Sequence, residues 1–385
     1  MIVHSMLKRR ISLMSAILAA TALCLPPLSS MSVQAQQHLS LDRTVDAQGI
    51  AYWTPGRLRN AQPLSSGLID LGELMEAAEP DGAEATGEAE GHPGNLHAFN
   101  VQPDWTNRLF EPGEEPKSLG STSDIEPKDI GTFGAHFSSS RVFPAGIETF
   151  YPYSTIGKLF FTLPNGAPAV CSAAVVSFRL VVTAGQCVHQ GFGGQSGFHS
   201  NFLFVPAYQQ GVAPLLIWDW QRAVVTGEWS NGGGTVPNAA DYALIETQDQ
   251  LVNGVTRRIG EVTGGLGWQT LSLLPNHVHM FGYPTNLDGG EIMHQVTGQS
   301  FGPIAPNNAA YGSDMGPGAG GGPFVQNFGE LALGHIDGLN PLRNAVVGVS
   351  SAFSPPPGFA QAGSIFDSRF VDLFNNACAN RPGNC

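Results

Sequence analysis

Short runs rich in Val, Ile, Leu and Phe, most of them bounded by Gly, Pro, Asn or Ser, fill the chain from about Phe150 onward. Such runs with turns between them are typical of β-strands. The 48 glycines and 28 prolines favour tight turns over long helices. The sequence therefore predicts an antiparallel all-β fold, a barrel or a sandwich. We expect strands at residues 156–162, 169–177, 179–183, 201–205, 215–220, 242–246, 277–283, 292–301, 323–326, 331–335 and 345–351.

One segment near the end of the chain has helical rather than strand spacing. Phe366, Phe370 and Phe374 recur on one face, and Asp367 stands near the start of the pattern. We expect a helix over residues 366–377.

The first 35 residues have the pattern of a secretory signal peptide. Basic residues at positions 8–10 precede an apolar run from Ile11 to about Leu25, and Val33-Gln34-Ala35 has small residues at the cleavage spacing. The run is too short, and too soon broken by proline, for a membrane anchor. We expect cleavage after Ala35 and export to the periplasm or the medium.

Residues 36–147 form an acidic, low-complexity extension. Residues 76–95 lack apolar periodicity and contain Pro and Gly, so we expect disorder there. Just before them, residues 67–75 could form one short amphipathic helix. The extension is either a pro-segment or partner-binding tail, or a solvated addition. Arg141, in a stretch of small residues, is a candidate processing site.

Four of the five cysteines lie beyond the signal peptide. An even number in an exported chain indicates two disulfides. Their spacing suggests Cys171–Cys187 and Cys378–Cys385, although four cysteines allow three pairings.

The charge of the chain excludes one class of partner. Loss of the basic residues at positions 8–10 would lower the net charge from −13 to −16. An acidic chain lacks the basic surface that nucleic acids and anionic membranes require, so neither is expected as a partner. No cofactor is expected, and the sequence does not indicate an oligomeric state.

Three segments in a fixed order carry a resemblance to the trypsin-like serine proteases. Thr183-Ala184-Gly185-Gln186-Cys187 resembles the family's Thr-Ala-Gly-His-Cys motif. Asp241 stands at the position of the family's acid, and the glycine-rich stretch of residues 316–323 resembles the nucleophile loop. Intervals of 55 and 79 residues between Gln186, Asp241 and Gly320 suit the His–Asp–Ser order of chymotrypsin-like enzymes.

The resemblance covers about residues 148–378 and is nearest to the bacterial glutamyl-endopeptidase-like branch. It implies a protease-like domain over residues 148–385. This domain would consist of two six-stranded antiparallel β-barrels with a C-terminal helix, preceded by a disordered N-terminal extension.

Two of the three residues that would perform the reaction are replaced in this chain. Gln186 stands in place of the general base, and its amide forms hydrogen bonds but cannot hold the proton near neutral pH. Gly320 stands in place of the nucleophile and has no side chain. Asp241 is retained, and we expect the Gln186 amide to donate to it. The N–H groups of Gly318 and Gly320 would form the oxyanion hole.

The remaining polar residues do not restore this chemistry. His189 and Ser313 are candidates for a substitute base and nucleophile, but the turn after the motif is expected to carry His189 away from the cleft. His277 and His279 share a strand face, which we interpret as an ordinary strand rather than a metal site. Ser350 stands on one wall of the pocket where the glutamate-cutting branch has a histidine, so that preference does not carry over.

The sequence thus predicts a secreted, catalytically inactive protease homologue that binds a peptide or protein in the remaining cleft. One alternative is an active secreted serine-type endopeptidase with an unrecognised base and nucleophile. A second is a surface or matrix component in which the barrels are only a scaffold. Reaction of a serine with a covalent probe, and competition of peptides for the cleft, would separate the three.

Overall fold

The computed structural model describes residues 38–44, 49–64, 67–70, 86–95, 101–111, 136–329, 342–355 and 358–385. The expected signal peptide and the strand expected at residues 331–335 lie outside these ranges.

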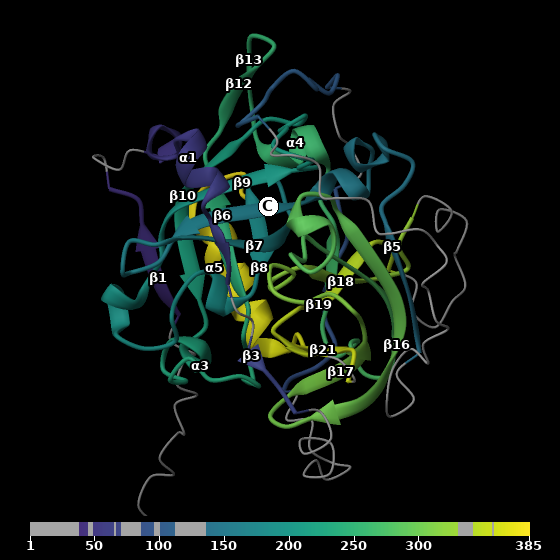
Figure 1. The fold of residues 1–385 in the computed structure, drawn as a ribbon. Helices are drawn as coiled ribbons and strands as arrows, with labels where there is room; N and C mark the ends of the chain where they lie inside the picture. The colour runs from purple at the N-terminus through teal and green to yellow at the C-terminus, as the bar shows by residue number, and fades with distance from the viewer. Residues whose placement is uncertain are drawn as a thin grey trace, which may run out of the picture. The chain divides into compact units, whose positions relative to one another are not determined.

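Six antiparallel strands of the first half close into a barrel (Figure 1). Their order is β10–β11–β8–β7–β6–β9, and a further pairing of β9 with β10 closes the ring. Every residue of β6 and β8 is buried, as expected for strands rich in Val, Leu and Phe. The strands are β6 (Ile156–Thr162), β7 (Pro168–Val175), β8 (Leu180–Thr183), β9 (Ser200–Pro206), β10 (Trp218–Val225) and β11 (Ala243–Thr247).

The second half forms a larger sheet, in which β16 bends between two neighbours. Residues 294–299 of β16 pair with β15 and residues 300–304 pair with β17, and the register of the second pairing shifts between Ser300 and Gly302. The sheet order over this half is β20–β21–β17–β16–β15–β18–β19–β14. These strands are β14 (Gly267–Gln269), β15 (His277–Gly282), β16 (His294–Ile304), β17 (Asn308–Gly312), β18 (Pro323–Gln326), β19 (Ala345–Val349), β20 (Ala352–Ser354) and β21 (Ala360–Ser364).

The predicted fold class is confirmed: a mostly β chain with a closed six-stranded barrel, a second large sheet and a C-terminal helix. Strands poor in β-branched residues were missed, among them β17 and β21, which are mostly Ala, Gly and polar residues. These segments form strands because they pair with neighbouring strands, and residue propensity does not predict such pairing. The hairpin of β12 (Gln250–Val252) and β13 (Val255–Arg257) was also missed.

The short helices are α1 (Pro55–Arg59), α3 (Gly227–Ser230), α4 (Ile259–Thr263) and the 3-10 turns at Gly49–Tyr52, Ile147–Thr149, Tyr153–Thr155, Gly185–Cys187, Gly194–Gly197 and Asp288–Gly290.

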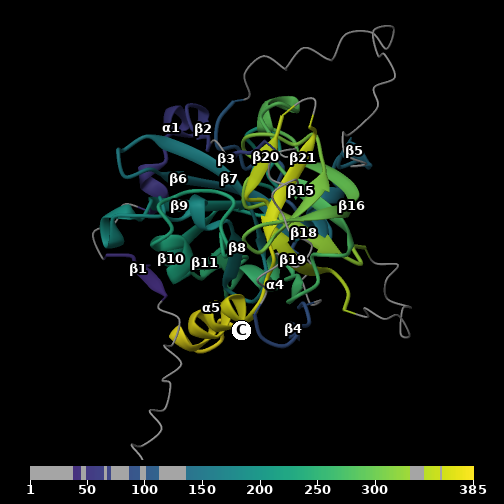
Figure 2. The same cartoon turned by 90° about the horizontal axis from the view of Figure 1, so that it is seen from below.

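The described parts of the N-terminal extension add β1 and β2 to the first sheet and β3, β4 and β5 to the second. Among the described residues the second sheet has eleven strands, eight of them from the second half of the chain, where six were expected. Exposed sheet edges offer unpaired backbone groups that such segments can satisfy. Figure 2 shows β2 and β3 on the side of the molecule where β6, β7 and β20 lie. The pairs are β1 (Leu39–Asp42) with β10, β2 (Gln62–Pro63) with β7, β3 (Gly67–Leu68) with β20, β4 (Gly91–His92) with β14, and β5 (Phe137–Arg141) with β16.

Three expectations for the extension need correction. The helix expected over residues 67–75 is wrong at its start, because Gly67–Leu68 is a strand; residues 71–75 lie outside the described ranges. The expected disorder is wrong for residues 86–95, where β4 pairs with β14. Arg141 lies in β5 and forms an ion pair with Asp288, so the candidate processing site is not an unpaired linker.

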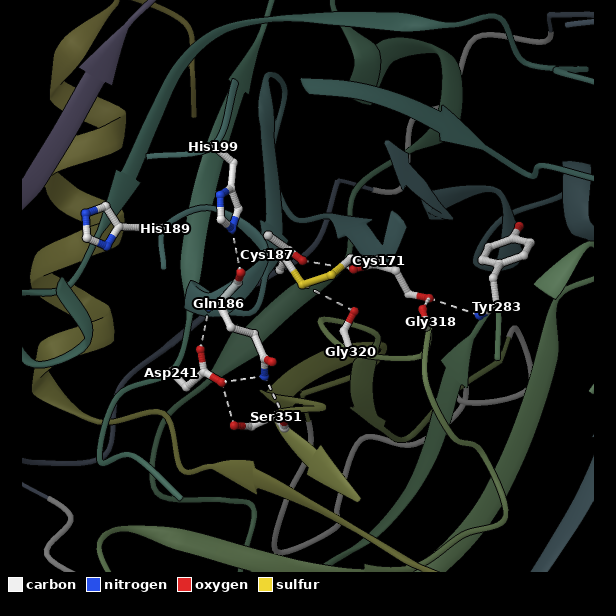
Figure 3. The surroundings of a disulfide bond; sticks show 12 residues. Cys171, Gln186, Cys187, His189, His199, Asp241, Tyr283, Gly318, Gly320 and Ser351 are labelled. Carbon is white, nitrogen blue, oxygen red and sulfur yellow. Dashed lines mark hydrogen bonds between the residues drawn. A yellow bond between two sulfur atoms is a disulfide. The ribbon is translucent and has the colours of Figure 1, made fainter. Parts of the chain in front are cut away.

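Both predicted disulfides are present. Cys171 and Cys187 join β7 to the turn after β8, with a Cα–Cα distance of 6.2 Å (Figure 3). Cys378 and Cys385 join the C-terminal helix to the last residue, with a Cα–Cα distance of 5.4 Å. None of the helices within the described residues is long and apolar enough to span a membrane.

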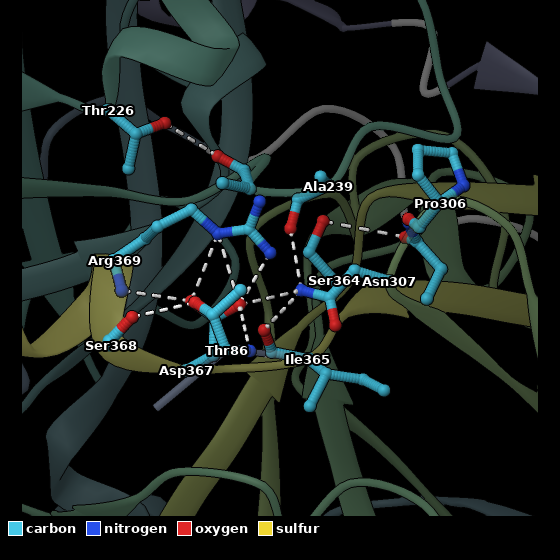
Figure 4. Close-up of polar contacts among 12 residues, drawn as sticks. Thr86, Thr226, Ala239, Pro306, Asn307, Ser364, Ile365, Asp367, Ser368 and Arg369 are labelled. Atoms are coloured by element: carbon cyan, nitrogen blue, oxygen red, sulfur yellow. Dashed lines mark hydrogen bonds and ion pairs between the residues drawn. The ribbon is translucent and has the colours of Figure 1, made fainter. Parts of the chain in front are cut away.

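The C-terminal helix α5 (Ser368–Asn380) is fixed at its start by the buried Asp367 (Figure 4). Asp367 caps the helix by accepting from the Arg369 N–H and forms an ion pair with the Arg369 guanidinium. It also accepts from the hydroxyl of Tyr242 at 3.2 Å and the amide of Asn307 at 3.3 Å. The Thr86 N–H donates to it from the extension. One carboxylate therefore joins the helix, both sheets and the extension.

We predict that Asp367→Ala lowers the free energy of unfolding by about 3–5 kcal/mol, because it removes the carboxylate that pairs with the buried Arg369 guanidinium. Asp372→Ala, an exposed position on the same helix, is the matched control and should change stability by less than about 0.5 kcal/mol. Urea denaturation of both variants provides the measurement. Equal unfolding midpoints for the two would contradict the role assigned to Asp367.

Candidate functional site

A fully buried carboxylate, that of Asp241, lies at the centre of the site (Figure 3). Its Oδ1 accepts from the backbone N–H of Gln186 at 2.8 Å. Its Oδ2 accepts from the side-chain Nε2 of Gln186 at 2.9 Å and from the hydroxyl of Ser351. Both oxygens are therefore satisfied, and the donor expected from the Gln186 amide is present.

The turn that carries Gln186 is fixed by the disulfide and by close packing. Gln186 lies in the 3-10 turn Gly185–Cys187 that follows β8, and the disulfide to Cys171 anchors the end of that turn. A Cβ on Gly185 would lie 2.6 Å from the Trp229 ring and 3.0 Å from Asp241 Oδ1. Glycine is therefore required here by close approach, and its small size lets Asp241 reach the turn.

The side chain of Gln186 acts as a double donor. Besides its hydrogen bond to Asp241, Nε2 donates to the backbone carbonyl of Ser351. Both amide hydrogens are thus engaged, and the side chain is only 8% exposed. This arrangement orients the amide firmly, but a carboxamide has no site that takes a proton near neutral pH.

Burial has the largest effect on the pKa of Asp241. The loss of hydration raises the pKa of its carboxyl from 3.8 to about 6, against the hydrogen bonds from Ser351 and Gln186 that lower it. With this pKa the carboxylate form predominates at neutral pH, and the described residues around it stabilise its charge by hydrogen bonds.

The glycine-rich loop at Gly320 is held by main-chain hydrogen bonds to both sheets. The N–H of Ser172 in β7 donates to the Gly320 carbonyl at 2.8 Å, and the Ser172 hydroxyl donates to the Gly318 carbonyl at 2.8 Å. The N–H of Gly321 donates to the Ser350 carbonyl at 2.7 Å. Among the described residues, the N–H groups of Gly318 and Gly320 have no acceptor. The oxyanion hole that we expect from these two groups remains a prediction.

Backbone conformation distinguishes the glycines of this loop. Gly318 has φ +96° and Gly321 has φ +79°, which L residues rarely adopt. Gly320 does not have a positive φ. The backbone conformation therefore favours glycine at Gly318 and Gly321, whereas Gly320 lacks the positive φ that would require glycine.

His189 and Ser313, the candidates for a substitute base and nucleophile, form hydrogen bonds with residues close to them in the sequence. His189 is fully buried; its Nδ1 accepts from the Gly191 N–H at 2.9 Å and its Nε2 lies 2.8 Å from the Gly194 carbonyl. The hydroxyl of Ser313 accepts from the Met315 N–H at 3.2 Å. Figure 3 shows His189 pointing away from Asp241 and Gly320. The described structure does not bring this pair together.

A second histidine, His199, approaches Gln186 and was missed by the sequence analysis. Its Nε2 lies 3.0 Å from the Gln186 backbone carbonyl, and its ring stacks on Phe161. Burial lowers its pKa to about 4, so the ring is neutral at neutral pH. It contacts the backbone of Gln186 rather than Asp241, and nothing in its spacing along the chain indicated this.

Two further contacts define the wall of the site. Ser351, which donates to Asp241, was also missed; its place directly after Ser350 was the available signal. The hydroxyl of Ser350 accepts from the amide of Gln361 at 3.0 Å, and both residues are buried. The Ser350 hydroxyl is therefore engaged by Gln361, and its place on a pocket wall remains a prediction.

The paired histidines of β15 belong to an aromatic surface. The His279 ring stacks on Phe281 and Phe328, with centroid distances of 6.2 and 5.4 Å. No group of three or more His, Cys, Asp or Glu side chains that could hold a metal ion occurs in the described part of the chain.

A pocket of about 320 Å³ opens beside Gln186. The β6–β7 turn, the segment after Gln186 and the extension all contribute to it. Its lining consists of Leu64, Leu163, Pro164, Asn165, Gln186, Gln190, His199, Trp229 and Gly234.

Solved structures similar to this chain are serine proteases. A thermostable serine protease, AL20, from an extremophilic microorganism has 26% sequence identity and a TM-score of 0.50, and the match covers 59% of this chain and 98% of that one. Protease Anisep from Arthrobacter nicotinovorans has 26% identity and a TM-score of 0.48, covering 59% of this chain and 96% of that one. A Glu endopeptidase has 18% identity and a TM-score of 0.48, covering 63% and 97%.

The similarity to the first of these shows that the chain has the trypsin-like serine protease fold, as its motifs predicted. No protein-family model matches the sequence, and no curated protein is similar to it.

The raised pKa of Asp241 predicts a pH dependence of stability. Between about pH 4 and pH 6 the folded chain holds a proton that the unfolded chain has lost, so the free energy of unfolding should fall as the pH rises through this window. The expected change is about 2–3 kcal/mol. Asp241→Asn does not titrate, so we predict that the difference between the wild type and this variant falls over the same window. A difference that stays constant in denaturation experiments from pH 4 to pH 7 would contradict this.

Proposed function

We propose that this protein is a secreted, catalytically inactive homologue of the trypsin-like serine proteases that binds an extended peptide or protein segment in its cleft. One observation carries the proposal. The Gln186 amide occupies the place of the general base and is bound as a donor to both Asp241 and the Ser351 carbonyl.

Acyl transfer by this fold needs a base and a nucleophile in contact. In subtilisin, loss of either the serine or the histidine lowers turnover about 10⁶-fold, and losing both adds little because they act as a unit. Here Gln186 cannot accept the proton and Gly320 has no hydroxyl to attack with. The hydrogen bonds of His189 and Ser313 are to neighbouring residues, and His199 Nε2 contacts the Gln186 backbone carbonyl rather than Asp241.

Binding does not require either of the replaced side chains. The N–H groups of Gly318 and Gly320, which have no acceptor among the described residues, and the pocket beside Gln186 remain available to a ligand. Strand edges such as that of β20 accept an extended chain by main-chain hydrogen bonds. These features support a peptide or a protein segment as the partner.

Export is part of the proposal. The apolar run and small residues before position 36 have the pattern of a signal peptide. Two disulfides are typical of proteins that fold in an oxidising compartment.

If the framework is intact, two substitutions should restore a reactive serine. In Gln186→His, the imidazole can donate to Asp241 from Nδ1 and leave Nε2 for a serine. Gly320→Ser places the hydroxyl at a position whose backbone accepts side chains. We predict that the double variant reacts with a small fluorophosphonate probe at the hydroxyl that Gly320→Ser introduces, measured as a mass increase of the intact protein, whereas the wild type does not react.

The matched control is Gln186→Asn with Gly320→Ser, which carries the hydroxyl without a base and should react at least about 10³-fold more slowly than the double variant. Stoichiometric labelling of the wild type at a serine would favour the active endopeptidase instead. A folded double variant that stays unlabelled would mean that the site is no longer arranged for this chemistry.

A further inference from the structure

Two short strands of the N-terminal extension pair with the sheets on opposite sides of the site. β2 runs parallel to the start of β7, and the Leu64 N–H donates to the Val170 carbonyl at 3.0 Å. β3 runs parallel to β20, and the Ile69 N–H donates to the Phe353 carbonyl at 3.1 Å. The extension thus adds one strand to the barrel and one to the second sheet within a few residues.

The two pairing points directly flank the residues of the site. Val170 precedes Cys171, whose disulfide holds the Gln186 turn. Ala352, the β20 partner of Gly67, follows Ser351, which bonds to Asp241 and Gln186. Leu64 and Gly67 are three positions apart in the sequence, and three residue steps span at most about 11 Å.

The side chains of this segment are fitted to the surface beneath it. Ile69 is 5% exposed and packs in a cluster with Ile304, Ala310 and the alanines of β20 and β21, whereas its neighbour Leu68 points outward and is 70% exposed. A Cβ on Gly67 would lie 1.7 Å from Val236 Cγ2, so the surface accepts no side chain there. Leu64 lines the pocket that also contains Gln186. This alternation is what a bound extended peptide shows.

We propose that β2 and β3, with Leu64 and Ile69, are an intramolecular ligand of the cleft, which an external peptide must displace. The inference rests on the proposed function and names its ligand class. That class is an extended peptide without charges, with glycine at the position of Gly67 and a branched aliphatic residue two positions later, bound by strand pairing.

The covalent connection of β2 and β3 to the rest of the chain strengthens their binding to the cleft. A tethered segment has an effective concentration in the millimolar range, which micromolar free peptide does not overcome. The apparent dissociation constant for external peptide rises in inverse proportion to the fraction of molecules whose cleft is open. Release of β3 should therefore tighten the binding of an added peptide without any change in the cleft surface.

The test uses the full chain and a fluorescein-labelled peptide of residues 61–69, with affinity measured by fluorescence anisotropy. Gly67→Val should expel β3 through the contact with Val236. Gly56→Val, in α1 of the same extension, is the matched control, since its nearest neighbour is 4.0 Å away. Hydrogen exchange at the Leu64 and Ile69 amides reports whether the segment is bound.

We expect the peptide to bind Gly67→Val at least about tenfold tighter than the wild type or Gly56→Val, with faster exchange at Ile69. A labelled peptide that itself carries Gly67→Val should bind none of the three. Ile69→Asp, which places a charge in the apolar cluster, is a second way to release β3 and should give the same gain.

Three results would overturn the inference, and they are distinguishable. Equal affinity for all variants, with β3 released, would mean that the segment does not compete, although the cleft still binds peptides. Absence of peptide binding to a released variant would instead contradict the proposed function as well. Unchanged exchange at Ile69 in both variants would contradict the packing on which the inference depends.

Discussion

The buried carboxylate of Asp241 is the group on which the site depends. A charge without solvent must be matched by donors, and an unpaired buried acceptor costs about 1–3 kcal/mol or more. Gln186 from the barrel and Ser351 from the second sheet supply those donors. The interaction therefore joins the two halves of the fold at the place where chemistry would occur. Glutamine meets the structural requirement that a histidine would meet, without meeting the chemical one.

Gln186 and Gly320, the two positions that we interpret as replaced, differ in their structural constraints. Gln186 is constrained by Asp241 and by the Ser351 carbonyl, so its side chain still has a role in stability. Gly320 has no such role, because its backbone does not require glycine while that of its neighbours Gly318 and Gly321 does. Under the proposed function, the Gln186 contact is needed for the structure of the site and a side chain at position 320 is not. The extension, which pairs across this site through β2 and β3, is compatible with such a cleft.

The sequence predicted those features that local composition carries. The Val- and Phe-rich strands β6 and β8, both disulfides and the Gln186–Asp241 contact followed from residue type, spacing and motif order. The sequence did not predict the features that depend on tertiary pairing between strands. β21 is mostly alanine and polar residues, and β3 and β4 are two-residue strands that form only because a sheet edge accepts them. His199 reaches Gln186 through the barrel, which no local pattern reports.

The central claim is that a site built on Asp241 and Gln186 holds its shape without performing hydrolysis. The most direct measurement is prolonged incubation of the wild-type protein with a mixed peptide library, with products identified by mass spectrometry. We expect no cleavage beyond that of an Asp241→Asn sample. Cleavage by the wild type that is lost in Asp241→Asn would contradict the account, because it would show that this carboxylate still orients a working base.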